Sequence, residues 1–132
     1  MNTIALFAAS LILGATSATL VPGAWIQVAG GAWVPNEAVV SQVASSLEVY
    51  VEAAAKRQGR DVRPWSEYSF QYQGRILKGR RYVFIAGLCA TFADTDLSAD
   101  FYEVLDGGSC YFRLTFDPKR QRFGNLHINA IR

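Results

Sequence analysis

The chain has few of the side chains on which most enzymes depend, with one histidine and two cysteines among its 132 residues. A zinc site needs three or four ligands from histidine, cysteine or acidic residues, and Cys-His catalysis needs a free thiolate beside an imidazole. His127 has no second histidine to work with, and no carboxylate occupies a position where a buried strand residue is expected. We therefore predict a protein that is not an enzyme, with no catalytic residue, no metal and no cofactor.

The chain also lacks a strong excess of one charge. Thirteen lysines and arginines against eleven acidic residues give a formal net charge of +2. Nucleic-acid binding usually leaves a much denser basic surface, so we expect no nucleic-acid partner. The partner expected instead is another protein or a second copy of the chain.

The first 36 residues contain no charged side chain at all. A predominantly apolar run of twelve residues over 4–15 is followed by Thr-Ser-Ala at 16–18, a pattern typical of a signal peptide with a small-residue cleavage site. The run is too short for a membrane span, which needs about 20 apolar residues. We predict a signal peptide over residues 1–18, cleaved near Ala18, and a secreted or periplasmic protein with no stable membrane span. An uncleaved anchor is the alternative.

The two cysteines, Cys89 and Cys110, flank a segment rich in acidic residues. In the oxidising environment outside the cytoplasm, a single pair of cysteines most simply forms a disulfide, and this pairing is our prediction. The acidic residues between them lack the ligand spacing of a calcium loop. We predict instead a short helix over 99–106, capped by Ser98, with Phe101 and Leu105 turned inward and glycines ending it.

The hydrophobic pattern predicts a single α+β domain over residues 37–132. Apolar residues recur every three or four positions over 37–58, which indicates an amphipathic helix with Asn36 as its N-cap. Alternating or continuous apolar patterns then indicate four strands in two hairpins, over 66–73, 81–87, 111–116 and 125–131. We predict that the helix packs on a four-stranded antiparallel sheet. Residues 19–36, rich in glycine and containing Trp25 and Trp33, form a trunk that is either a mobile arm or a strand or contact segment.

A helix followed by an antiparallel meander resembles the cystatin-like fold, and more loosely the nuclear-transport-factor-2-like group. The sequences "AGLC" and "DGGSCYF" also resemble small exported bacterial proteins of this shape, whose function is unknown. Cystatins inhibit cysteine proteases with a trunk glycine and two hairpin motifs. Gly30 and Gly31 could supply the glycine, but residues 71–74 read Gln-Tyr-Gln-Gly and Pro118 is followed by lysine instead of tryptophan. The resemblance therefore implies the fold without classical protease inhibition.

Three groups of residues are candidates for contact with a partner or ligand. The trunk carries Trp25 and Trp33, and His127 shares the polar face of the last hairpin with Arg113 and Asn129. A basic turn follows the first strand; its residues are Arg75, Lys78, Arg80 and Arg81. Each group also has a simpler explanation, as an N-terminal arm, as ordinary exposed strand residues or as a solvated hairpin tip.

The hypothesis that follows is a small exported binding or inhibitor-like protein that acts through protein–protein contact. A second hypothesis is a homodimeric assembly protein of the cell envelope, joined through the outer sheet face, where either Tyr82 and Phe84 or Val83 and Ile85 need covering. A third is a small-ligand enzyme or binder, with its ligand in a cone between helix and sheet.

Overall fold

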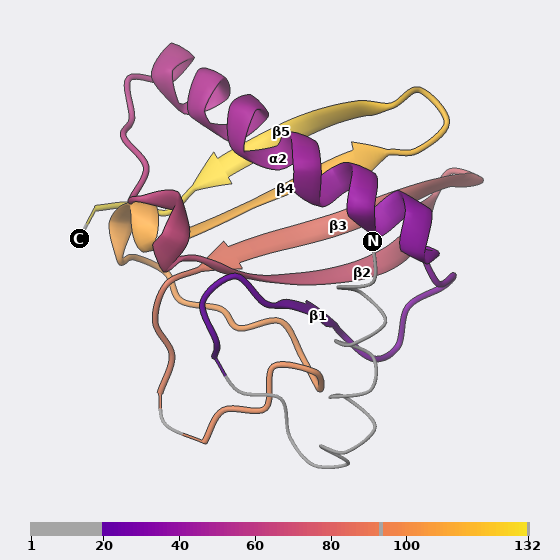
Figure 1. Cartoon of the computed structure of the whole chain (residues 1–132), viewed down its shortest axis with the longest axis horizontal. Coiled ribbons are helices and arrows are strands. Elements are labelled where there is room, and N and C mark those ends of the chain that lie inside the picture. Colours follow the sequence, from indigo (N-terminus) through magenta and orange to yellow (C-terminus); the bar gives the residue numbers. More distant parts are fainter. Residues whose placement is uncertain (1–19, 93, 132) are drawn as a thin grey trace.

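The computed structural model describes residues 20–92 and 94–131, which form one helix packed on one face of a five-stranded mixed sheet (Figure 1). The predicted signal peptide over 1–18 lies outside the described residues. No helix in the described part of the chain is both long enough and apolar enough to cross a membrane.

Helix α2 (Glu37–Arg57) confirms the predicted amphipathic helix. The side-chain Oδ1 of Asn36 accepts a hydrogen bond of 2.9 Å from the backbone N–H of Val39, which satisfies one of the donors left open at a helix start. Gly59 adopts a left-handed φ of +69°, the usual end of a helix. The buried stripe of the helix consists of Val43, Leu47, Val51, Ala54 and Ala55.

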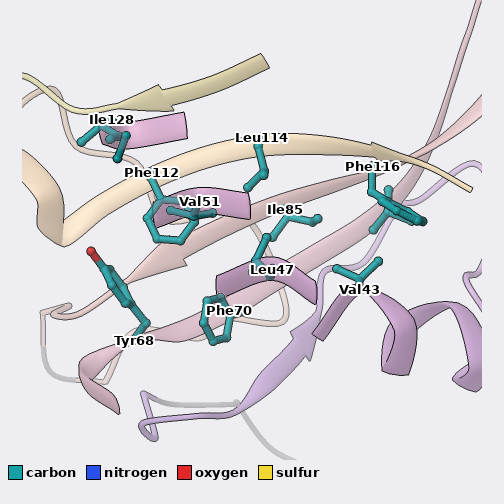
Figure 2. Close-up of a cluster of buried hydrophobic side chains, with 12 residues drawn as sticks. Val43, Leu47, Val51, Tyr68, Phe70, Ile85, Phe112, Leu114, Phe116 and Ile128 are labelled. Carbon is teal, nitrogen blue, oxygen red and sulfur yellow. The ribbon is translucent and has the colours of Figure 1, made fainter. Parts of the chain in front are cut away.

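The helix stripe packs against the inner face of the sheet, the face turned toward α2. Figure 2 shows Val43, Leu47 and Val51 from the helix directed toward aromatic and branched side chains of the strands. Twelve residues of this cluster are each no more than 5% exposed, so close packing fills the space between helix and sheet. Tyr68 is fully buried there, and its hydroxyl accepts a bond from the N–H of Arg63 and donates to the carbonyl of Ser109.

Four strands form the predicted antiparallel meander: β2 (Ser69–Leu77), β3 (Arg80–Leu88), β4 (Tyr111–Asp117) and β5 (Arg122–Ile128). The prediction of four strands is nevertheless incomplete, because β1 (Trp25–Gln27) adds a fifth at the edge, parallel to β2. Helix α2 is the crossover between these two parallel strands, and parallel neighbours require such a long connection. A strand of three residues is too short to show an alternating pattern, so the sequence left the trunk undecided.

Both hairpin turns are tighter than predicted. The β2–β3 turn consists of Lys78 and Gly79, whose φ angles of +50° and +77° fit the two-residue turn favoured by twisted hairpins. Residues 71–74, compared above with an inhibitory hairpin motif, therefore lie inside β2. The last strand was predicted over 125–131 but begins at Arg122 and ends at Ile128, because strand pairing already starts opposite Asp117.

The predicted short helix over 99–106 is wrong: these residues are irregular, and Leu105 is 96% exposed. The physical reason is the side chain of Gln71, which is fully buried on the outer face of β2. Its amide nitrogen donates to the carbonyls of Leu97 and Asp100, at 2.8 and 2.9 Å, and its oxygen accepts from the N–H of Tyr102 at 3.0 Å. These backbone groups thus find partners in the sheet without forming a helix. The described chain has two short 3-10 helices instead, η1 (Trp65–Glu67) and η2 (Gly108–Cys110).

Candidate binding site

Residues 89–92 and 94–107, called the covering segment below, lie between β3 and η2, and residues 97–102 lie against the outer face of the sheet, the face turned away from α2. A disulfide joins Cys89 to Cys110 with a Cα–Cα distance of 5.1 Å, which confirms the predicted pairing. The N–H of Cys89 also donates to the carbonyl of Cys110 at 3.0 Å. The two ends of the covering segment are therefore fixed beside each other at one end of the sheet.

The middle of the covering segment is held by a second, smaller core. Leu97 is fully buried and packs with Ile26 of β1 and Leu88 of β3. The N–H of Ala29 donates to the carbonyl of Ser98 at 2.9 Å, so the trunk and the covering segment also share a backbone hydrogen bond. Together with the bonds of Gln71, these contacts hold residues 97–102 on the outer face.

Beyond this anchor the segment leaves a hollow of about 470 Å³ between itself and strands β3 and β4. Phe84, Ala86 and Leu88 of β3 line the sheet side, and Phe101, Tyr102 and Val104 are among the residues on the opposite wall. Ala86 is the small residue between two large ones on this face of β3. Its short side chain leaves open the space that a larger residue would occupy.

Two arginines also line the hollow, Arg75 from β2 and Arg113 from β4. The guanidinium of Arg75 lies 3.9 Å above the ring centre of Phe84, and its Nε donates to Oε1 of Gln73 at 2.8 Å. Arg113 is exposed and pairs across the sheet with Ala86 on one side and His127 on the other. Glu103 is the one acidic residue in the lining, which therefore carries a net charge of +1.

Asn129 also borders the hollow, but the structure corrects its expected exposure. It is 5% exposed, and its side-chain nitrogen donates to the carbonyls of Val104 and Asp106 at 2.8 and 3.0 Å. The strand ends at Ile128, so the alternation that placed Asn129 beside His127 stops before it. Asn129 supports the wall of the hollow, whereas His127 is exposed opposite Arg113 and lies outside the lining.

The structure separates Arg75 from the other three residues of the predicted basic turn. Arg75 borders the hollow, while Lys78 is exposed in the turn itself. Arg80 forms an ion pair with Asp117 of β4. The guanidinium of Arg81 lies 5.1 Å from the ring centre of Trp33. Lys78, Arg80 and Arg81 therefore stay together at the β2–β3 turn, whereas Arg75 lies apart from them at the hollow.

Both trunk tryptophans contribute to the fold. The ring of Trp25 stacks on Phe70 with 4.7 Å between ring centroids. The indole N–H of Trp33 donates to the carbonyls of Arg75 and Tyr82, at 3.0 and 3.1 Å. Both rings are partly buried against the main core, so each contributes packing to the fold as well as some exposed surface.

Sequence reasoning missed Gln71, Ala86 and Phe101, which together create the hollow. Gln71 was visible only as one of the polar residues alternating with aromatic ones in β2. Its burial depends on a segment 26 to 31 residues further along the chain, and no local pattern encodes that contact.

The side chains around the hollow offer apolar, aromatic and cationic groups to a ligand. Burial raises the pKa of the Tyr111 hydroxyl, with smaller contributions from Tyr102 and Asp106, so this lining residue stays neutral. Within residues 20–92 and 94–131, no three histidine, cysteine or acidic residues gather closely enough to hold a metal ion. Comparison of the chain with models of protein families, with curated proteins and with solved structures found no match.

Proposed function

We propose that this chain is a small exported protein that binds a partner protein, without catalysis, by accepting an apolar segment with a carboxylate into the hollow on the outer sheet face. The observation that carries the proposal is the combination of an aromatic and aliphatic lining with two guanidinium groups in one hollow. The disulfide supports the exported location, because such bonds persist mainly in oxidising compartments.

The lining determines the chemistry of the bound segment. A volume of about 470 Å³ lies within the range of pockets that hold small molecules or a few side chains. The partly exposed rings of Phe84 and Phe101 offer apolar surface, and the exposed guanidinium of Arg113 can form a paired hydrogen bond with a carboxylate. An aromatic or branched side chain next to an acidic residue or a chain terminus fits this pattern.

The two other hypotheses have less support. A cone between helix and sheet would need space that the buried cluster around Leu47 and Ile85 fills. Dimerisation through the outer face was suggested because the apolar residues expected on that face would need a second copy of the chain to cover them. The chain covers much of that face itself, since Phe101 meets Phe84 edge to face at 5.2 Å and Leu97 buries Leu88.

A peptide selection tests the proposal directly. A random peptide library is enriched on the wild-type protein, and the affinity of the recovered peptides is measured by calorimetry. We expect the recovered peptides to share an acidic group beside an aromatic or aliphatic residue. Ala86→Phe, which fills the hollow from a position facing away from the helix, should abolish binding, and Arg113→Gln should weaken it about tenfold or more, the effect of losing a charged hydrogen bond.

The matched control is Val49→Phe, an enlargement at a residue of α2 that is 73% exposed and lies on the other side of the sheet. It should bind the peptides as the wild type does. Peptides without an acidic group, or equal binding by Ala86→Phe, would refute the proposed site.

A further inference from the structure

A second surface lies at the opposite end of the sheet from the disulfide, where the two hairpin turns project together (Figure 1). The pairing of β3 with β4 reaches Val83 and Phe116, and both turns lie just beyond this pair. The ion pair between Arg80 and Asp117 connects the two hairpins across that end. We call this surface the hairpin end.

The hairpin end concentrates positive charge from two separate parts of the sequence. Six of the thirteen basic residues lie there: Lys78, Arg80, Arg81, Lys119, Arg120 and Arg122. Asp117 is the one acidic residue in these two turns and their flanking positions. Apart from Arg80, none of these six cations forms an ion pair with any residue that the structure describes. A net charge of only +2 for the whole chain therefore conceals a strongly basic end.

Asp117 also organises this end. Its carboxylate accepts hydrogen bonds from the backbone N–H groups of Lys119 and Arg120, at 3.0 and 3.1 Å, in addition to the bond from Arg80. The β4–β5 turn is thus held in one conformation beside the β2–β3 turn. The remaining cations are presented on a preformed support, which reduces the entropy lost when they bind.

Exposed apolar side chains lie among these charges. Ile76 is 46% exposed and Leu77 is 55% exposed, and they pair across the hairpin with Arg81 and Arg80. Ile76 and Leu77 are the last two residues of β2, directly before the turn. The exposed end of a hairpin in water is normally polar, so two exposed branched residues beside the turn need an explanation. Cations beside exposed apolar groups match a bilayer surface, which offers lipid phosphates and, just below them, acyl chains.

We propose that the hairpin end docks on the surface of a bilayer containing anionic phospholipids, with the cations on the phosphates and Ile76 and Leu77 inserted below them. This inference is independent of the ligand proposed for the hollow. The covering segment, which holds five of the eleven acidic residues, lies toward the other end of the sheet, so docking in this orientation keeps that negative charge away from the lipid (Figure 1).

The test is vesicle flotation with the full chain, using phosphatidylcholine vesicles with and without phosphatidylglycerol. Lys119→Gln/Arg120→Gln removes two exposed charges at the hairpin end, and Lys56→Gln/Arg57→Gln removes two exposed charges at the far end of α2. Every protein carries the same residues 1–19, so any binding by that segment is common to all of them. Thermal melts establish that each variant is folded.

We expect binding to anionic vesicles to fall about fivefold for each charge lost near the surface, hence about 25-fold in the hairpin-end variant. The far-end variant should bind within about twofold of the wild type, and salt should weaken binding, since screening acts over about 10 Å at 0.1 M. Ile76→Ser/Leu77→Ser should retain the initial electrostatic attraction but lose binding at high salt.

Three results would overturn the proposal. One is equal loss of binding in the two charge variants, which would indicate a dependence on net charge alone. Another is equal binding to neutral and anionic vesicles. The third is loss of binding in the charge variant with no effect of Ile76→Ser/Leu77→Ser at any salt concentration, which would indicate a general polyanion site, such as one for an acidic protein.

Discussion

The side chain of Gln71 gives the most direct test of how the covering segment is held. Gln71→Met keeps the approximate length of the side chain but removes one acceptor and one amino group that donates twice. Each of the three bonds contributes about 1 kcal/mol net, so we expect the free energy of unfolding to fall by about 3 kcal/mol. This is a large share of the 5 to 15 kcal/mol that is typical of a domain.

A second variant, Gln71→Glu, distinguishes the effect of losing hydrogen bonds from the effect of repulsion between oxygen atoms. Gln71→Glu keeps an acceptor for the N–H of Tyr102 but presents another oxygen to the carbonyls of Leu97 and Asp100. At neutral pH it should be less stable than Gln71→Met, because a buried carboxylate would face two carbonyl oxygens with no donor between them. Acidification should reduce this difference as the carboxyl group becomes protonated.

Urea unfolding measures the stability, and amide hydrogen exchange locates the change. In both variants the amide of Tyr102 should exchange faster than the loss of global stability explains, whereas the amide of the core strand residue Ile85 should exchange faster only in proportion to that loss. Peptide binding in the hollow should weaken in parallel, because Phe101 and Tyr102 form its wall. A loss below about 0.5 kcal/mol in Gln71→Met, with unchanged exchange at Tyr102, would refute the role given to Gln71.

Three further predictions concern the disulfide, the carboxylate of Asp117 and the close contact between Gly74 and Trp33. Replacing Cys89 and Cys110 with alanine should lower stability by about 3 kcal/mol, the value for a closed loop of this size, and free-thiol titration of the denatured, unreduced wild type should find no reactive thiol. Burial alone would raise the pKa of Asp117, but hydrogen bonds from backbone N–H groups and from an arginine outweigh it and lower that pKa. The stabilising effect of the ionised Asp117 is therefore complete above about pH 4 and is lost as pH falls through the pKa of the folded state. The difference in free energy of unfolding between wild type and Asp117→Asn should then shrink on acidification. A difference that stays constant would contradict this. A Cβ atom on Gly74 would lie 2.2 Å from the carbonyl oxygen of Trp33. Gly74→Ala should therefore destabilise the protein and red-shift the tryptophan fluorescence as Trp33 becomes more exposed, and a fully stable variant would show that the trunk can move away.

The sequence determined the features that rest on local pattern. The helix over Glu37–Arg57 was readable because one apolar stripe, an asparagine cap and a terminal glycine all agree. The four antiparallel strands were predictable from their alternating or continuous apolar patterns. The disulfide was predictable because the chain has two cysteines and a predicted export signal, a combination that leaves one simple pairing.

Only the tertiary structure decided how distant segments share partners. The three residues of β1 become a strand because β2 offers them an edge, and the predicted helix over 99–106 is absent because Gln71 bonds its backbone. The hollow depends on Ala86 facing a segment that follows it in the chain but folds back over it. The hairpin end joins cations about 40 residues apart, which the register of β3 on β4 brings together. Short-range periodicity reports which face of an element is apolar, but which distant groups meet on that face is a property of the assembled sheet.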